Sequence, residues 1–177
     1  MFRITMTILV LIKMSSLAFA QQHPSPYADE RERKIKALST EEMAGYLSGH
    51  GMGFAKAAEL NHYPGPKHVL ELAPQLNLPA EQFSKTKAIH DEMLNHAVPL
   101  GKQYVKKEAE LDSLFSHQKI AEALLQSLVS EISAIKGQLR LVHLNAHLEM
   151  KRLLTPEQIA KYDELRGYKK SDHHFQH

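Results

Sequence analysis

Residues 93–146 read MLNHAVPLGKQYVKKEAELDSLFSHQKIAEALLQSLVSEISAIKGQLRLVHLNA, and the apolar pattern of this stretch predicts most of the architecture. Apolar residues recur at steps of three, four and seven on both sides of Ser116, as in amphipathic helices. The two stripes consist of Met93, Ala97, Leu100, Tyr104, Leu111 and Leu114, and of Leu125, Leu128, Ile132, Ile135, Leu139, Val142 and Ala146. The stripes mirror each other about Ser116, so that Met93 faces Leu139. They predict an all-α fold built on a long antiparallel hairpin that turns at Ser116, with this serine as N-cap of the second helix.

Shorter helices are expected before the hairpin. Ser39 and Glu42 form a capping box, which predicts a helix that starts near Thr40. Three glycines in residues 49–53 predict a break, and short helical pieces follow at residues 54–61 and 67–73. A hairpin buries one stripe per helix, so its core is thin, and we expect a homodimer or a wide exposed face. In the alternative arrangement the two long helices belong to separate bundles, but the short turn between them favours neighbours.

The N-terminus carries the pattern of an export signal. A basic residue, Arg3, precedes an apolar run, and Ala18-Phe19-Ala20 has the form of a cleavage site, which predicts a signal peptide over residues 1–20. The alternative, a membrane-spanning anchor, needs about 20 apolar residues, whereas this run is about half that. Residues 21–38 are expected to form a flexible arm, residues 39–168 the helical domain, and residues 169–177 a disordered histidine-containing tail.

Composition and charge exclude several classes of function. The chain of 177 residues has 22 basic side chains, 20 acidic ones and no cysteine. Loss of residues 1–20 removes two basic side chains and leaves a formal net charge of zero, which argues against nucleic-acid binding. Without cysteine there is no disulfide, thiol nucleophile or cysteine-based metal site. Neither H-E-x-x-H nor G-x-S-x-G occurs, and the glycines at 49–53 lack the ending of a phosphate loop, so an enzyme is not indicated.

A short motif occurs twice, at the starts of two predicted helices. In Leu154-Thr155-Pro156-Glu157-Gln158, the threonine is a good N-cap and the glutamine three residues later can close a capping box. A related window, Leu78-Pro79-Ala80-Glu81-Gln82, precedes the first long helix. It has proline where the other window has threonine, so it cannot supply a hydroxyl cap.

These two windows resemble the LTxxQ repeats of the Spy/CpxP family of periplasmic stress proteins, whose relatives include ZraP and periplasmic heavy-metal sensors. The residues that carry the resemblance are Leu78, Gln82, Leu154, Thr155 and Gln158. The resemblance implies a periplasmic, cradle-shaped helical homodimer that binds unfolded client proteins without ATP. It equally allows an envelope-stress or metal regulator, with a membrane sensor kinase as a further partner.

Met52 and Phe54 are the candidate client-binding residues. A promiscuous surface needs adaptable apolar side chains, and both residues lie in or beside the glycine-rich segment. The alternative is that both belong to the hydrophobic core.

Histidines supply a candidate metal site. His143 and His147 are four residues apart and share a helix face, and a turn at Ser116 brings His90 near them from the other helix. Three imidazoles could hold zinc, nickel or copper. Lysine and arginine side chains on the same face oppose metal binding, and the alternative is a half-buried His90 beside two solvated rings. A pH-sensing role is a further possibility for these histidines, since the imidazole side chain titrates near neutral pH. The tail histidines, His173, His174 and His177, form a separate cluster of weak affinity.

Overall fold

The computed structural model describes residues 25–168. The predicted signal peptide, the start of the predicted arm and the predicted tail lie outside the described residues. The chain divides into two units, of which the first ends at Arg31 and holds a short 3-10 helix, η1 (Ala28–Glu30). All the structural features below belong to the second unit, which starts at Glu32.

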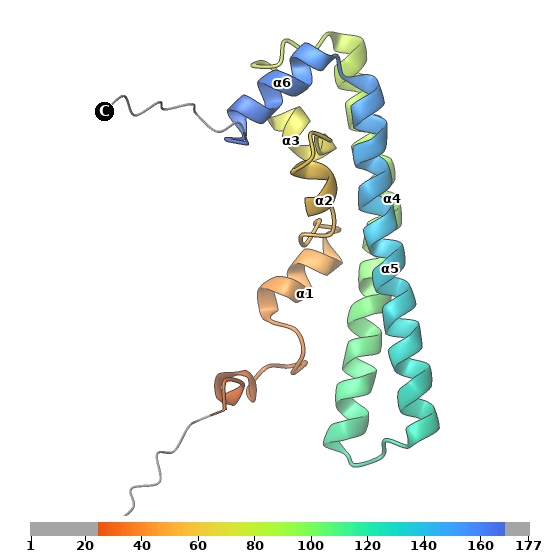
Figure 1. Cartoon of the computed structure of the whole chain (residues 1–177). Helices are drawn as coiled ribbons and strands as arrows, with labels where there is room; N and C mark the ends of the chain where they lie inside the picture. The colour runs from red at the N-terminus through yellow and green to blue at the C-terminus, as the bar shows by residue number, and fades with distance from the viewer. Residues whose placement is uncertain (1–24, 169–177) are drawn as a thin grey trace, which may run out of the picture. The chain divides into compact units, whose positions relative to one another are not determined.

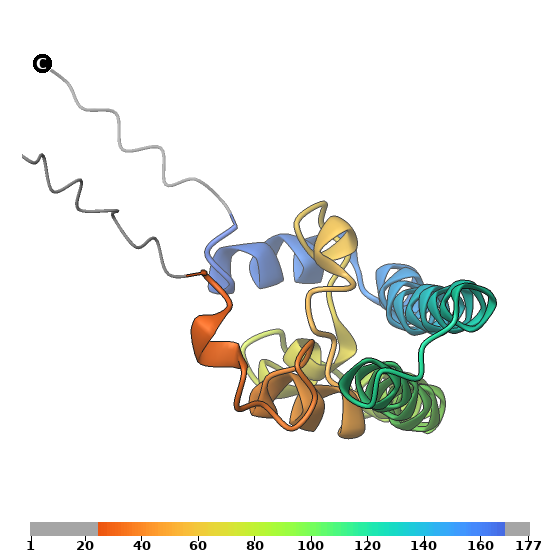
Figure 2. The same ribbon diagram turned by 90° about the horizontal axis from the view of Figure 1, so that it is seen from below.

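All the regular elements in the described part of the second unit are helices, joined by turns and loops. Its helices are α1 (Thr40–Leu47), α2 (Lys56–Glu59), α3 (Pro66–Glu71), α4 (Ala80–Ser116), α5 (Glu122–Leu153) and α6 (Pro156–Leu165). The long helices α4 and α5 lie side by side as an antiparallel hairpin (Figure 1), and the short helices lie along one side of it (Figure 2). The predicted fold class is confirmed, while the dimer stays a prediction. No helix within residues 25–168 is long and apolar enough to cross a membrane.

The turn of the hairpin differs from the prediction. Ser116 is the last residue of α4 rather than the N-cap of α5, which is Ala121. The N–H groups of Gln118 and Lys119 bond back to the carbonyls of residues 115 and 114, and Gln118 has φ +55°, which together form a Schellman motif. The chain therefore reverses later than predicted. Lys107 forms an ion pair with Glu131 at 2.8 Å, whereas a turn at Ser116 would place residue 125 opposite it.

The short helix α1 packs directly on α4. The predicted capping box starts it: the N–H of Glu42 donates to Ser39 Oγ at 3.1 Å, and the N–H of Ser39 donates to Glu42 Oε2 at 2.8 Å. At the contact with α4, a Cβ built on Gly101 would lie 1.9 Å from the carbonyl oxygen of Tyr46. Only glycine therefore permits this approach of the α1 backbone to α4.

The core consists of two separate clusters, one at the middle of the hairpin and one at its open end. The first cluster joins α1 to the middle of the hairpin through Ile35, Leu38, Tyr46, Ala97, Tyr104 and Leu139. The second cluster joins α3 and α6 to the open end of the hairpin through Val69, Leu76, Met150, Leu154, Ile159 and Tyr162.

The stretch before α1 is more ordered than the flexible arm that we predict from its charge. Ile35 and Leu38 are 4% and 3% exposed and belong to the first cluster. The N–H of Lys36 also donates to the carboxylate of Asp112 at 3.1 Å, which ties this stretch to α4. Burial of these two apolar side chains with Tyr46 and Tyr104 in the first cluster anchors a stretch that is otherwise rich in charge.

Candidate functional site

The second motif window joins α5 to α6. The chain is extended at Leu154, whose side chain is buried in the second cluster, and α6 begins at Pro156. The N–H of Gln158 donates to Thr155 Oγ1 at 3.2 Å, and the N–H of Thr155 donates to Gln158 Oε1 at 2.9 Å. This geometry confirms the predicted capping box.

The first window opens α4 without a side-chain cap, since its N-cap is Pro79. Gln82 instead reaches across the hairpin: its Nε2 donates to the carbonyl oxygen of Leu153 at 3.0 Å and to Gln158 Oε1 at 3.1 Å. Gln158 Nε2 donates back to Gln82 Oε1 at 2.7 Å. The carbonyl of Leu153 lies at the end of α5 and has no partner within its own helix. The two glutamines therefore form a reciprocal amide pair that ties together the start of α4, the end of α5 and the start of α6.

This pair predicts coupling between the two motif copies. Gln82→Ala and Gln158→Ala should each lower the free energy of unfolding by about 1–3 kcal/mol, because each leaves a half-buried amide without its partner. The double variant should lose less than the two single losses together, by at least about 0.5 kcal/mol. Urea unfolding of the four proteins measures this coupling. Gln126→Ala, on the exposed side of α5, is the matched control and should add independently to Gln82→Ala; additive losses for Gln82 and Gln158 would contradict the coupling.

A pocket of about 390 Å³ lies beside the hairpin and is lined by residues of the 49–55 loop, of α2 to α5, and by Arg166 directly after α6. Histidine is the commonest residue in its lining, with the rings of His50, His68, His90, His143 and His147. The structure thus brings together the three histidines that the sequence singled out, and it adds two that the sequence did not.

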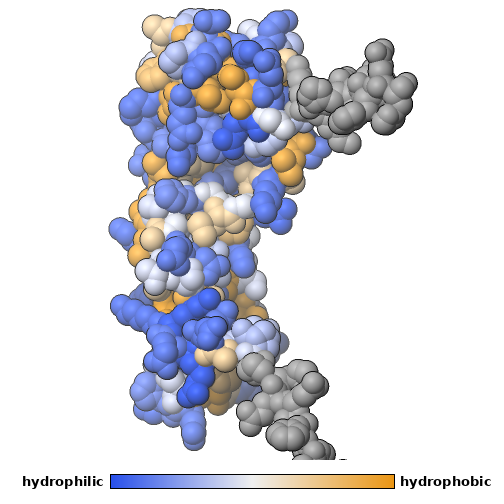
Figure 3. Space-filling view, turned by 90° about the vertical axis from the view of Figure 1, so that its left-hand side faces the viewer, coloured by the Kyte–Doolittle hydropathy of each residue, from blue (hydrophilic) through white to orange (hydrophobic). Residues whose placement is uncertain are grey.

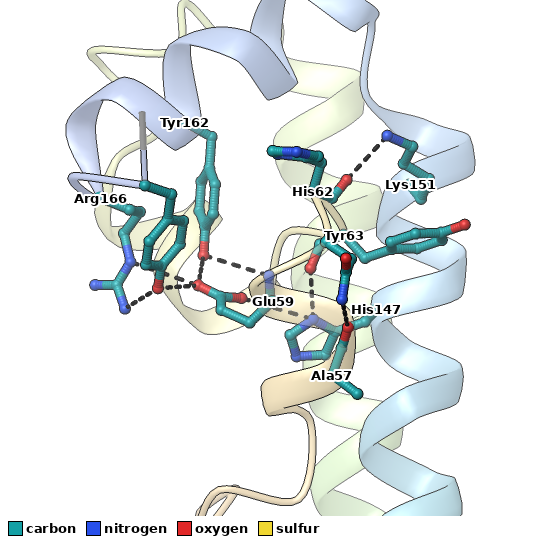
Figure 4. A network of polar contacts seen from close by, with 11 residues as sticks. Ala57, Glu59, His62, Tyr63, His147, Lys151, Tyr162 and Arg166 are labelled. Atoms are coloured by element: carbon teal, nitrogen blue, oxygen red, sulfur yellow. Dashed lines mark hydrogen bonds and ion pairs between the residues drawn. The ribbon is translucent and has the colours of Figure 1, made fainter. Parts of the chain in front are cut away.

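His147 is held in one orientation in this pocket. Its Nδ1 donates to the carbonyl oxygen of Tyr63 at 2.7 Å and lies 3.7 Å from Glu59 Oε2 (Figure 4). The ring is 7% exposed, and burial lowers the pKa of His147 despite the opposing effects of the Tyr63 carbonyl and the Glu59 carboxylate. The Nε2 atom is the ring nitrogen left to meet a ligand.

His143 is more completely engaged than the sequence suggests. The residue is 3% exposed, its Nδ1 lies 2.8 Å from the carbonyl oxygen of Leu139, and its Nε2 lies 3.3 Å from the carbonyl oxygen of Gly49. The ring also packs on Phe54, with 5.9 Å between ring centroids. Both nitrogens therefore face backbone oxygens, and a metal ion at either one would have to displace that contact.

His90 lines the same pocket from α4 and is half-buried. Burial lowers the pKa of His90, and its Nδ1 lies 3.9 Å from Asp91 Oδ1. In the arrangement of residues 25–168, no set of three or more histidine, aspartate or glutamate side chains is placed to hold a metal ion.

A buried carboxylate forms one wall of the pocket. Glu59 Oε1 accepts hydrogen bonds from the hydroxyl groups of Tyr162 at 2.5 Å and Tyr168 at 2.9 Å, and it lies 3.5 Å from Arg166 Nε (Figure 4). Burial, and then the Glu59 carboxylate, raise the pKa of Tyr162, which remains a hydrogen-bond donor. From the sequence, Glu59 is notable only for the E-x-x-H spacing that it shares with His62. The two tyrosines that donate to Glu59 lie about a hundred residues later in the chain. No local sequence pattern therefore indicates this network.

The two client-binding candidates lie in different environments. Met52 is 37% exposed, and its sulfur fills the space that a Cβ on Gly45 would need. Phe54 is half-buried and packs against the first cluster, with its ring 6.2 Å from that of Tyr46. Met52 therefore offers a free apolar surface, whereas most of Phe54 belongs to the core.

Fold and motif together define a class of protein, an all-helical hairpin whose two glutamine-containing helix starts meet at the open end. The family model described as "LTXXQ motif family protein" matches residues 66–166, more than half of the chain. The protein belongs to this family, which is of the Spy/CpxP type and is associated with the periplasm. Comparisons with curated proteins and with solved structures give no match.

Proposed function

We propose that the protein is a periplasmic, ATP-independent chaperone or envelope-stress protein that binds unfolded or misfolded client proteins. Family membership supports this class, and the exposure of large apolar side chains along both arms of the hairpin is the observation that carries it. These side chains include Phe83, Phe115, Leu124, Val129, Leu141 and Leu148. On the face that carries the short helices, apolar patches lie between hydrophilic areas (Figure 3). Scattered apolar contacts of this kind suit weak binding of many sequences.

An apolar groove between α4 and α5 is the best-defined place for a client segment. It has a volume of about 380 Å³ and is lined by Pro99, Leu100, Leu141 and Val142 together with a few polar side chains, among them Asn95. Leu141 is 57% exposed. Because Pro99 has no N–H, the carbonyl of Asn95 loses its partner within the helix, which leaves a hydrogen-bond acceptor beside the groove. An extended segment with apolar side chains and a free N–H fits this surface.

A variant of the exposed side chains tests the proposal. The double substitution Leu141→Ser and Leu148→Ser should leave the fold intact, since these side chains are 57% and 42% exposed. It should markedly weaken the ability of the purified protein to suppress aggregation of a chemically denatured client, measured by light scattering. The control on the same helix is Arg140→Ser with Glu149→Ser, which removes two exposed polar side chains of opposite charge. Failure of the unaltered protein to suppress aggregation at several-fold molar excess would contradict the proposed function.

A metal sensor or regulator is the second candidate function, and it is favoured by the presence of His90, His143 and His147 in the lining of one pocket. The engagement of both His143 nitrogens opposes it, as do the lysine and arginine side chains of the same pocket. A sensor-kinase partner rests on the family alone, whereas a homodimer rests on the family and on the thin core of the hairpin.

Calorimetry with zinc, nickel and copper tests the second candidate. The protein used has the three tail histidines replaced by alanine, so that weak binding at the tail cannot contribute. If this pocket holds the metal, His147→Ala abolishes the remaining heat of binding, while His96→Ala, at a ring 62% exposed and outside the pocket, leaves it unchanged. A metal site in this pocket would be contradicted if the protein with the altered tail gave no heat of binding. It would also be contradicted if His147→Ala and His96→Ala reduced the heat of binding equally.

A further inference from the structure

The fixed charges of the histidine-lined pocket are mainly positive. Lys56, Lys67 and Arg166 line it, and Glu59 is the one acidic side chain among its described lining residues. Glu59 is already engaged by two tyrosine hydroxyl groups and by Arg166. The pocket therefore carries uncompensated positive charge that does not depend on the protonation of any histidine.

The two lysines are available to a ligand. Lys67 has its nearest carboxylate, that of Glu71, at 4.0 Å, and its side chain is 56% exposed. Lys56 has no ion-pair partner within the described part of the chain, and its side chain extends over Gly53. The lysines come from α2 and α3 and the arginine from the end of α6, so packing of three separate elements assembles this charge.

Hydrogen-bond donors accompany the charge. The loop over residues 49–55 lines the pocket, and in residues 25–168 the N–H groups of Gly51, Met52 and Gly53 have no acceptor. Met52 and Gly53 have positive φ angles of 42° and 76°. Successive free N–H groups in such a conformation attract oxygen anions.

We propose that this pocket binds a small polyanion, a molecule carrying two or more carboxylate or phosphate groups. Positive charge focused in a concave site attracts an anion and repels a divalent cation. A volume of about 390 Å³ is more than a bare ion fills, and it lies in the usual range of about 300–1,000 Å³ for small-molecule sites. This inference does not depend on the proposed binding of clients, because the exposed hairpin side chains and this pocket are different surfaces.

Calorimetry of the purified protein at low ionic strength tests the proposal, with citrate as the carboxylate probe and pyrophosphate as the phosphate probe. At least one probe is expected to bind, and Lys56→Gln with Lys67→Gln should weaken that binding at least about ten-fold. The matched control is Lys85→Gln with Lys87→Gln, which removes the same charge from an exposed part of α4 outside the pocket. The control should retain the affinity of the unaltered protein.

The comparison of the two probes then identifies the ligand chemistry as carboxylate, phosphate or both. Circular dichroism confirms that both double variants fold. No binding of either probe at millimolar concentration, or equal weakening in the pocket and control variants, would overturn the proposal. Binding of zinc in place of either anion would also overturn it. A protein that binds an anion without suppressing aggregation would contradict only the chaperone function.

Discussion

Gly101→Ala is expected to lower the free energy of unfolding by about 3 kcal/mol or more. The new methyl group would lie 1.9 Å from the carbonyl oxygen of Tyr46, which is a backbone atom and cannot rotate away. Either α1 must move away from α4 or the first cluster must open. The free-energy cost of either change should exceed the usual cost of about 1–3 kcal/mol for overpacking a core. Urea and thermal unfolding followed by circular dichroism measure the loss.

Gly137→Ala is the matched control, because it makes the same substitution in the other arm of the hairpin. No heavy atom lies within 4 Å of a Cβ built at Gly137. Alanine should therefore stabilise the protein by about 0.5–1 kcal/mol, the ordinary gain over glycine within a helix. Equal effects of the two substitutions would show that α1 does not pack on α4 as described.

The second large effect is expected from Glu59→Ala, with a loss of about 3–5 kcal/mol, as is typical when one partner of a buried charged network is removed. The substitution leaves the hydroxyl groups of Tyr162 and Tyr168 without their acceptor and Arg166 without its nearby carboxylate. Since these three residues lie in or beside α6, that helix should detach first.

Proteolysis under native conditions detects such detachment, as earlier cleavage near the end of α6. Glu81→Ala is the control: Glu81 pairs with Lys85, but its side chain is 79% exposed, and its removal should leave the unfolding midpoint nearly unchanged. An intact α6 in the Glu59 variant would mean that the second cluster alone holds this helix.

Local sequence patterns predict the features of this fold that depend on neighbouring residues. The capping boxes at Ser39 and Thr155 are formed by residues three apart, and both are present as predicted. The helical stripes likewise predict the hairpin. The predicted turn is wrong by several residues, because the Schellman motif that follows α4 depends on the positive φ angle of Gln118, which no local preference indicates.

The features that a sequence alone did not reveal depend on contacts across the chain. Gly101 looks like an unfavourable residue in a long helix until Tyr46 is placed against it. Gln82 looks like an incomplete cap until its amide meets that of Gln158. The sequence predicts only part of the candidate pocket. His143 and His147 share a face by spacing, whereas Lys56 and Lys67 reach it through the packing of α2 and α3.

The reciprocal bonds between Gln82 and Gln158 give the duplicated motif a structural consequence in this chain. A primary amide both gives a proton and accepts one, so each copy is the complement of the other, while a carboxylate or an ammonium group could supply only half of the exchange. The two copies in this chain therefore depend on each other structurally. During divergence, a substitution in one should persist chiefly when a compensating substitution arises in the other.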